Sequence, residues 1–146
     1  MKVRSIFRPG IACVTPADTL RDAARKMRST GQSCLPVVEG SSVTAILTEK
    51  DVTTAVAKGV SASETRVGDY ANDGSITVSL NDDCYAAELK MLAIGCRNLP
   101  VVDDGRLVGS VSMHDILLNA APAATAPAPL SDEWPEEPPP DVDSEG

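Results

Sequence analysis

The sequence predicts a mixed α/β (α+β) fold in which two copies of one β-α-β-β-α unit are related by pseudo-twofold symmetry. Residues 14–52 match the segment 64 positions later without a gap, and eleven positions of that alignment are identical. Unrelated segments agree at about one position in fifteen, so roughly two or three identities are expected by chance. The strand and helix signals also follow one order in both segments. An internal duplication explains both observations, and clefts shared by two like units are natural places to bind a small molecule.

The first copy begins with a short apolar strand and a helix. Residues 12–14 predict the strand. Thr19 and Asp22 form a Thr-x-x-Asp capping pattern, and apolar residues repeat at helical spacing from Leu20 onwards. Gly31 is typical of a helix C-terminal cap, so the helix is expected to end there.

A hairpin and a second helix complete the copy. Residues 34–39 are apolar and too few for a helix, and a Gly-Ser turn separates them from a strand over 43–47. Thr48 stands at the N-cap of a helix over 49–58, which Gly59 ends. The second copy repeats the unit with segments 76–78, 83–94, 98–103, 106–111 and 113–119, and with Asp104-Gly105 as its tight turn.

These elements divide the chain into a first unit over residues 3–60, a second over 61–119 and a tail. Residues 61–74 are polar with a short helical stretch capped by Thr65, and are expected to pack as a connector. The tail, 120–146, combines Ala-Pro alternation with acidic residues. It is expected to be disordered, because it cannot bury enough apolar area to offset chain ordering. Trp134 within it is either a docking anchor for a partner or a solvated side chain.

Composition excludes several classes of protein. The formal net charge is −8, but residues 121–146 hold seven acidic side chains and no Lys or Arg, so the rest of the chain carries about −1. No basic cluster with interleaved aromatics is present, which argues against a nucleic-acid surface. No apolar run approaches the ~18 residues that span a bilayer, and no secretory apolar region follows the N-terminus. A cytoplasmic protein without membrane contact is expected.

Catalytic and metal sites are not supported by the sequence. The cysteines at 13, 34, 84 and 96 show no Cys-x-x-Cys spacing, and His114 is the sole histidine, so neither a zinc site nor a nucleophile–base set can be written. Neither an enzyme nor a cofactor is expected. Reduced thiols are the default, and thiol-based regulation remains an alternative, with Cys13 and Cys34 on neighbouring short strands and Cys84 and Cys96 flanking one helix.

The strongest local signals are Thr48-x-x-Asp51 and Ser112-x-x-Asp115. Each starts where a strand ends and a helix begins, so a hydroxyl and free backbone N–H groups form a small anion site at the positive end of the helix. The Asp one turn later adds a carboxylate acceptor for a ribose diol. One Thr-x-x-Asp alone is a common helix cap, but its recurrence at the same place in both copies favours mononucleotide binding.

Each copy also has a strand that begins with Leu-Pro. The prolines, Pro36 and Pro100, lack an N–H and fix φ, which is expected to keep that edge out of a regular ladder. The backbone groups just before them are then free to meet a flat polar base. The alternative is a plain edge strand of the core.

With these residues the chain resembles the tandem CBS-domain pair, or Bateman module. The resemblance covers about residues 3–119 and rests on the Leu-Pro-Val-Val strand of both copies, on 109–112 with Asp115, and on the looser 45–48 with Asp51. It implies two units packed through their sheets, dimerisation into a disc of four units, and sensing of AMP, ADP, ATP or S-adenosylmethionine.

By position, the resemblance also implies roles for single residues. It places the Thr48 and Ser112 hydroxyls near phosphate or ribose, and Asp51 and Asp115 on ribose hydroxyls. The base pockets are implied to be lined by Thr15 with Leu35 and Pro36, and by Ser79 with Leu99 and Pro100.

Three positions are implied to make the two sites unequal. Arg97 falls where some members of the family place a basic phosphate contact, whereas the first copy has Ser33 there and is expected to bind multiply charged ligands more weakly. Ala45 replaces an expected glycine, and its β-carbon would narrow the first pocket. The expected function is regulatory sensing of an adenine nucleotide by a homodimer with an unknown protein target. The open alternatives are a dimeric adaptor that binds no nucleotide and a thiol-redox-responsive protein.

Overall fold

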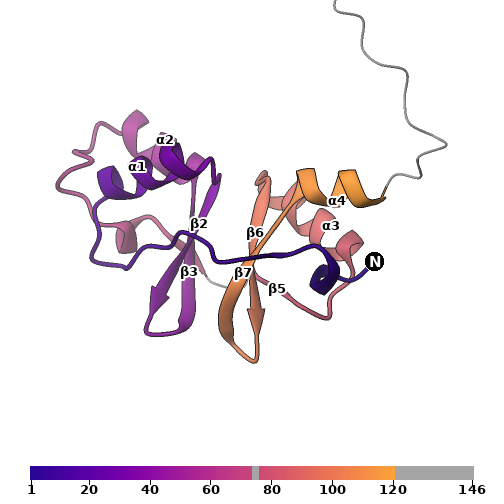
Figure 1. Ribbon diagram of the computed structural model, residues 1–146. Helices are drawn as coiled ribbons and strands as arrows, with labels where there is room; N and C mark the ends of the chain where they lie inside the picture. The colour runs from indigo at the N-terminus through magenta and orange to yellow at the C-terminus, as the bar shows by residue number, and fades with distance from the viewer. Residues whose placement is uncertain (74–75, 121–146) are drawn as a thin grey trace, which may run out of the picture.

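The computed structural model describes residues 1–73 and 76–120, and the predicted tail lies outside the described residues. Two units of like architecture meet through their strands, with helices on their outer sides (Figure 1). The predicted mixed α/β class is confirmed. The helices are α1 Leu20–Thr30, α2 Glu49–Ala57, α3 Cys84–Ile94 and α4 Met113–Ala120, with 3-10 helices η1 Val3–Ser5 and η2 Val67–Asp69. The strands are β1 Arg8–Pro9, β2 Cys34–Glu39, β3 Ser42–Thr48, β4 Asn72–Asp73, β5 Val78–Ser79, β6 Asn98–Asp103 and β7 Arg106–Ser112.

The strands are hydrogen-bonded in the order β2-β3-β7-β6-β5. β2 with β3 and β6 with β7 are antiparallel hairpins, and the hairpins meet where Ser42 pairs with Arg106. The predicted turn at Asp104-Gly105 has φ of 52° and 78°. Left-handed conformations at both central residues are what a tight hairpin turn requires, and Asp and Gly tolerate them.

Local capping signals fix the helix ends. The Thr19 hydroxyl accepts a hydrogen bond from the backbone N–H of Asp22, and Gly31 ends α1 with a φ of 73°. Asp83 caps α3, and its carboxylate accepts from the N–H of Tyr85. These contacts satisfy backbone groups that a helix terminus would otherwise leave unpaired.

The two Leu-Pro strands differ in position: β2 ends the strand order with only a short bridge beyond it, whereas β6 lies inside the sheet, which corrects the expectation of an edge for that strand. Pro36 is in register with Ile46 of β3, while its carbonyl accepts from the N–H of Val14 at 3.0 Å on the other side. The predicted strand over 12–14 is reduced to this parallel bridge. β6 is likewise flanked by β7 and by the short parallel β5. Proline is tolerated because a carbonyl still pairs where the N–H is missing.

The connector packs as predicted, but against the first copy. Val67 is fully buried in the first core, and its N–H donates to the carbonyl of Asp18 at 2.8 Å. Thr65 caps no helix, because η2 begins after Arg66 and its N-cap makes no side-chain hydrogen bond. The Thr65 hydroxyl instead donates to the carbonyl of Ser61.

The segment that precedes each copy packs against the other copy, where it adds a buried side chain to the core and a short strand to the sheet. Near the N-terminus, Val3 is fully buried in the core of the second copy, and β1 pairs with β7. Correspondingly, η2 and β4 pack on the first copy, where β4 pairs with β3. The segments are 64 positions apart, like the repeats themselves. Figure 1 shows the indigo N-terminal segment running along the orange second copy.

A buried polar network joins the copies. The N–H and hydroxyl of Ser33 both donate to the side-chain carbonyl of Asn98 at 2.9 Å, and the Ser33 hydroxyl accepts from the N–H of Arg97. Ser33 and Asn98 are buried, and every buried side-chain nitrogen and oxygen in the described parts of the chain has a partner. The network therefore holds the copies in one register without an orphaned group.

A small cluster of buried side chains lies beside this network. It consists of Cys34, Ile46 and Cys96, which come from both copies. The alternative in which Cys84 and Cys96 form a bridge is not supported, because Cys84 lies in the separate core of the second copy. Within the described ranges, no helix is long and apolar enough to cross a membrane.

Candidate ligand-binding clefts

Two cavities lie at related places between the copies. The first cleft, of about 310 Å³, includes Ser33 and Thr48, and the second cleft, of about 490 Å³, includes Arg97 and Ser112. Seven of the nine residues that line the first cleft have counterparts 64 positions away that line the second. The pairs are 33/97, 48/112, 49/113, 50/114, 94/30, 95/31 and 96/32.

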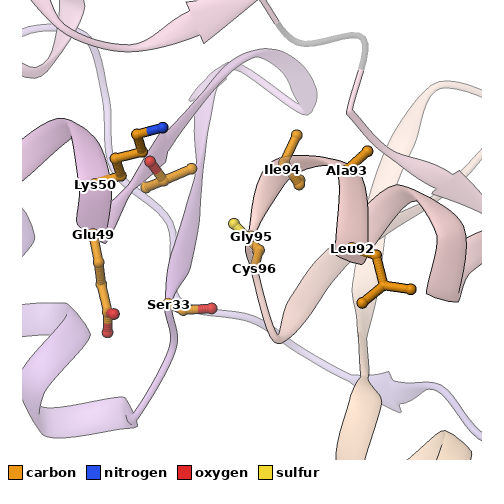
Figure 2. A pocket seen from close by; sticks show the side chains of 9 residues that line it. Ser33, Glu49, Lys50, Leu92, Ala93, Ile94, Gly95 and Cys96 are labelled. Carbon is orange, nitrogen blue, oxygen red and sulfur yellow. The ribbon is translucent and has the colours of Figure 1, made fainter.

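Each cleft combines the start of a helix from one copy with the end of a helix from the other. In the first cleft, Glu49 and Lys50 at the beginning of α2 face Ile94 and Cys96 at the end of α3 (Figure 2). In the second cleft, His114 near the beginning of α4 faces the end of α1. A ligand in either cleft therefore touches both copies.

At the first cleft, Asp51 serves the helix cap. Its carboxylate accepts from the N–H of Thr48 at 2.8 Å, and the Thr48 hydroxyl accepts in return from the N–H of Asp51. Asn72, on the exchanged strand β4, donates its side-chain amide to the same carboxylate oxygen at 2.8 Å. The motif is thus a complete capping box whose carboxylate has a further partner from the connector.

At the second cleft, Asp115 is held by Arg8 instead. Arg8 donates from Nε and Nη2 to the two carboxylate oxygens at 2.7 and 2.9 Å, and the Ser112 hydroxyl accepts from the N–H of Asp115. Arg8 on β1 stands 64 positions before Asn72, so the exchanged strand contacts the motif Asp in both copies. The hydrogen bonds from Arg8 lower the pKa of Asp115, whose carboxylate is buried.

Replacing Arg8 is expected to raise the pKa of Asp115 towards its ordinary value. Because folding lowers this pKa, the pair stabilises the protein above the unfolded pKa of about 3.9, and this contribution is lost as pH falls through the folded value. The difference in unfolding free energy between wild type and Arg8→Gln should therefore shrink as the pH is lowered below about 4. Carboxyl NMR titration and urea unfolding measure both effects. Arg4→Gln, on the same segment, is the control, and an unchanged Asp115 titration in Arg8→Gln would contradict the expectation.

The clefts differ in charge. The second is lined by two arginines, Arg8 and Arg97, and by His114, without an acidic side chain among its lining residues. The first is lined by Glu49 and Lys50, whose charges offset each other. Arg97 also lies 3.5 Å from Glu49, joining the mouths of the two clefts. The second cleft therefore has the greater cationic character, although Arg8 is paired with Asp115 and Arg97 lies near Glu49.

The predicted site residues fall into three groups. Thr48 lines the first cleft, and Arg97 and Ser112 line the second, while Asp51 and Asp115 lie directly behind these hydroxyls. Thr15 directly precedes a turn and Ser79 ends β5, and their N–H groups donate to the carboxylates of Asp18 and Asp82. The remaining four residues are buried in the strands and line neither cleft: Leu35, Pro36, Leu99 and Pro100.

Sequence reasoning missed Arg8, Gln32 and Asn98, all of which line the second cleft. Arg8 lies before the aligned segment of the first copy. Extending the 64-residue offset upstream pairs Val3 with Val67, and this signal would have placed the N-terminal segment inside the repeat.

Comparison with known families settles what the duplicated unit is. The family model described as "CBS domain" matches residues 3–58 and again residues 67–121. The chain belongs to the CBS domain family. It is a tandem CBS pair, as its motifs implied, and the exchanged segments and both clefts are features of this pair.

Curated relatives share most of the pair. An uncharacterised protein of Methanopyrus kandleri is 33% identical over 120 residues, which are 80% of this chain and 61% of the relative, so the chain spans less than two thirds of that protein. Hypoxic response protein 1 of Mycobacterium tuberculosis is 30% identical over 77% of this chain and 80% of its own length. These similarities extend over both copies.

Solved structures share the fold. A structure of Hypoxic Response Protein I with two coordinated zinc ions matches with a TM-score of 0.71 and 28% identity, over 82% of this chain and 98% of that one. A CBS domain protein from Pyrobaculum aerophilum complexed with AMP matches with a TM-score of 0.71 and 22% identity, over 80% and 90%. A CBS pair complexed with 5′-methylthioadenosine and S-adenosylmethionine matches with a TM-score of 0.67 and 22% identity, over 81% and 94%. Among the described residues of this chain, no group of three or more His, Cys, Asp or Glu is placed to hold a metal ion.

Proposed function

We propose that this CBS pair is a regulatory protein that binds an adenosine-containing ligand between its copies, with the second cleft as the main site for a phosphate-bearing ligand such as AMP, ADP or ATP. The observation that carries this proposal is the convergence of Arg8, Arg97 and the Ser112 hydroxyl at the beginning of α4. Solved CBS pairs that hold AMP or S-adenosylmethionine support the ligand class.

The second cleft offers each part of a nucleotide a matching group. The Ser112 hydroxyl and the guanidinium groups of Arg97 and Arg8 suit a phosphate. Asp115 has further acceptor sites besides the two that Arg8 uses, which suit ribose hydroxyls. Gln32 and Asn98 place amide side chains in the same cleft, where a base with donors and acceptors can be bound. The volume of about 490 Å³ is in the range of small-molecule sites.

The first cleft suits a less charged ligand. It is smaller, Glu49 lines it, and Ser33 takes the place that Arg97 has in the second cleft. A phosphate there would lie near the Glu49 carboxylate, and Lys50 is the one cationic side chain among the lining residues. We therefore propose unequal sites, with a nucleoside or a singly charged ligand preferred in the first cleft.

Calorimetric titration of the full chain with AMP, ADP, ATP and S-adenosylmethionine tests this function. Arg97→Ala should weaken AMP binding by roughly 10- to 100-fold, because a hydrogen bond to a charged group contributes about 1.5–3 kcal/mol. Arg106→Ala removes the same charge from an exposed position that lines neither cleft, and should bind AMP like the wild type. An equal loss of AMP affinity in Arg97→Ala and Arg106→Ala would contradict the assignment of AMP to the second cleft. Absence of binding to every ligand of the panel would leave the adaptor function instead.

We also propose that the protein is a homodimer formed by the second copies. Tyr85, Leu89 and Leu92 follow one face of α3 and are 66%, 50% and 71% exposed, and α4 exposes Leu117 and Leu118 beside it. An apolar patch of this kind is typical of an interaction surface. The corresponding helix α1 instead exposes Arg21, Arg25 and Arg28. The apolar face of α3 and α4 in one subunit thus matches the same face of a second subunit, which favours a head-to-head dimer.

Disrupting the apolar face of α3 is expected to give a monomer. Leu89→Glu with Leu92→Glu would place four carboxylates in the proposed dimer interface, two from each subunit, and desolvating unpaired charges is costly. Light scattering after size exclusion should show the mass fall by half. Arg25→Glu on α1 is the matched control and should remain dimeric. Dissociation of the dimer in the α1 variant, or a monomeric wild type, would refute this interface.

We propose that a ligand in the clefts acts by changing the relative free energies of alternative dimer geometries.

A further inference from the structure

Two thiols, one from each copy, meet at the junction of the CBS pair. Cys34 begins β2 and Cys96 follows α3, and together with Ile46 they form the small buried cluster beside the Ser33–Asn98 network. Their side chains pack in the same cluster, and each thiol shifts the pKa of the other. They do not occupy equivalent positions of the repeat, so this contact is a feature of the assembled pair rather than of either copy.

The two sulfurs have different access to solvent. Cys34 is fully buried, whereas Cys96 is 6% exposed and lines the first cleft. Figure 2 shows the Cys96 sulfur on the side of its loop that faces the first copy. A small solute that enters this cleft of about 310 Å³ therefore reaches Cys96 and not Cys34.

The two thiols also differ in acidity. Interaction with the Cys34 thiol stabilises the Cys96 thiolate and lowers the pKa of Cys96. The same interaction, together with burial, raises the pKa of Cys34 well above its ordinary value. The accessible member of the pair is thus also the better nucleophile, because the thiolate is the reactive form.

We propose that Cys96 and Cys34 are a redox pair, which hydrogen peroxide entering the first cleft oxidises to an internal disulfide that links the two copies. The Cys96 thiolate attacks one peroxide oxygen, so an S–O bond forms, the O–O bond breaks, and the released oxygen leaves as water after protonation. Cys34 then attacks the sulfenic sulfur of Cys96. The S–S bond forms, the S–O bond breaks, and the hydroxyl leaves as a second water.

In this reaction two thiols supply the two electrons that reduce one molecule of hydrogen peroxide. The products are one disulfide and two waters. The disulfide would fix the end of α3 against the start of β2, at the wall of the first cleft. Oxidation would therefore restrict the relative movement of the copies. The proposal does not depend on whether either cleft binds a nucleotide.

Hydrogen peroxide titration of the full chain, read by intact mass and by peptide mapping without reductant, tests the pair. The expected result is the loss of two hydrogens per chain, a Cys34–Cys96 linked peptide, and reversal by dithiothreitol. The Cys13→Ser/Cys84→Ser variant keeps only the proposed pair and should behave like the wild type. A linked peptide that joins any other two cysteines, or no internal link at excess peroxide, would overturn the proposal.

Single variants separate the roles of the two sulfurs. In Cys34→Ser, Cys96 should stop at the sulfenic acid and be labelled by dimedone, whereas Cys96→Ser should show neither label nor link. Iodoacetamide labelling of the reduced wild type gives a readout that needs no variant, and Cys96 should be alkylated before Cys34. Faster alkylation of Cys34 would contradict the assigned order of attack.

Discussion

Gly109→Val is expected to lower the free energy of unfolding by roughly 3 kcal/mol, at the upper end of the cost of overpacking, and to abolish most ligand binding in the second cleft. Strand β1 crosses β7 so closely that a β-carbon at Gly109 would overlap the carbonyl oxygen of Arg8 and press on the ring of Phe7. The overlapping atom belongs to the backbone and cannot turn aside. β1 must therefore leave β7 and withdraw Arg8 from Asp115.

Denaturant unfolding and AMP calorimetry measure the two effects of Gly109→Val. Ala45→Val is the matched control, because position 45 is the counterpart of 109 and pairs with Asp73 of β4 while already carrying a β-carbon. Ala45→Val should lower the free energy of unfolding less than Gly109→Val does, and should leave AMP binding in the second cleft unchanged. A Gly109→Val protein with wild-type stability and an unchanged Asp115 titration would show that β1 does not need the glycine.

Asn98→Ala is expected to lower the free energy of unfolding by about 2 kcal/mol, because it leaves buried hydrogen-bond donors without an acceptor. The Asn98 side-chain carbonyl accepts both the N–H and the hydroxyl of Ser33 at 2.9 Å. Ser33 is buried between the copies, so its two donors depend on this directly bonded acceptor. The loss should loosen the contact between the copies before it affects either core.

A double-mutant cycle separates this network from general damage. Ser33→Ala, Asn98→Ala and the double variant are compared by urea unfolding, and their coupling energy should be substantial because the side chains are in direct contact. Glu39→Ala, at an exposed position of β2, provides the baseline for a surface change. Additive effects of the two central substitutions would contradict a shared network.

Features set by neighbours in the sequence were predictable. The Thr19 cap, the Gly31 terminus and the Asp104-Gly105 turn each depend on residues within one helical turn or one hairpin, and the structure confirms them. The hydroxyls of Thr48 and Ser112 were placed at helix starts for the same reason, and the structure adds that each lines a cleft.

Features set by distant segments were not predictable from these signals. Nothing near Arg8 in the sequence indicates that it contacts Asp115, because the contact depends on β1 packing against the other copy. The meeting of Cys34 with Cys96 depends likewise on how the copies are joined. The interior position of the second Leu-Pro strand was not predictable either, because β5, which covers it, is only two residues long.

The crossing of the N-terminal segment to the far unit determines how the chain can be dissected. A fragment ending near residue 60 would keep Val3, which packs in the core of the second copy. The same fragment would lack Val67, which packs in the core of the first copy. A piece from about residue 11 to residue 73 would instead contain all of one interior. Two fragments produced by a cut near residue 60 would thus complement each other on mixing, each donating the strand that the other needs.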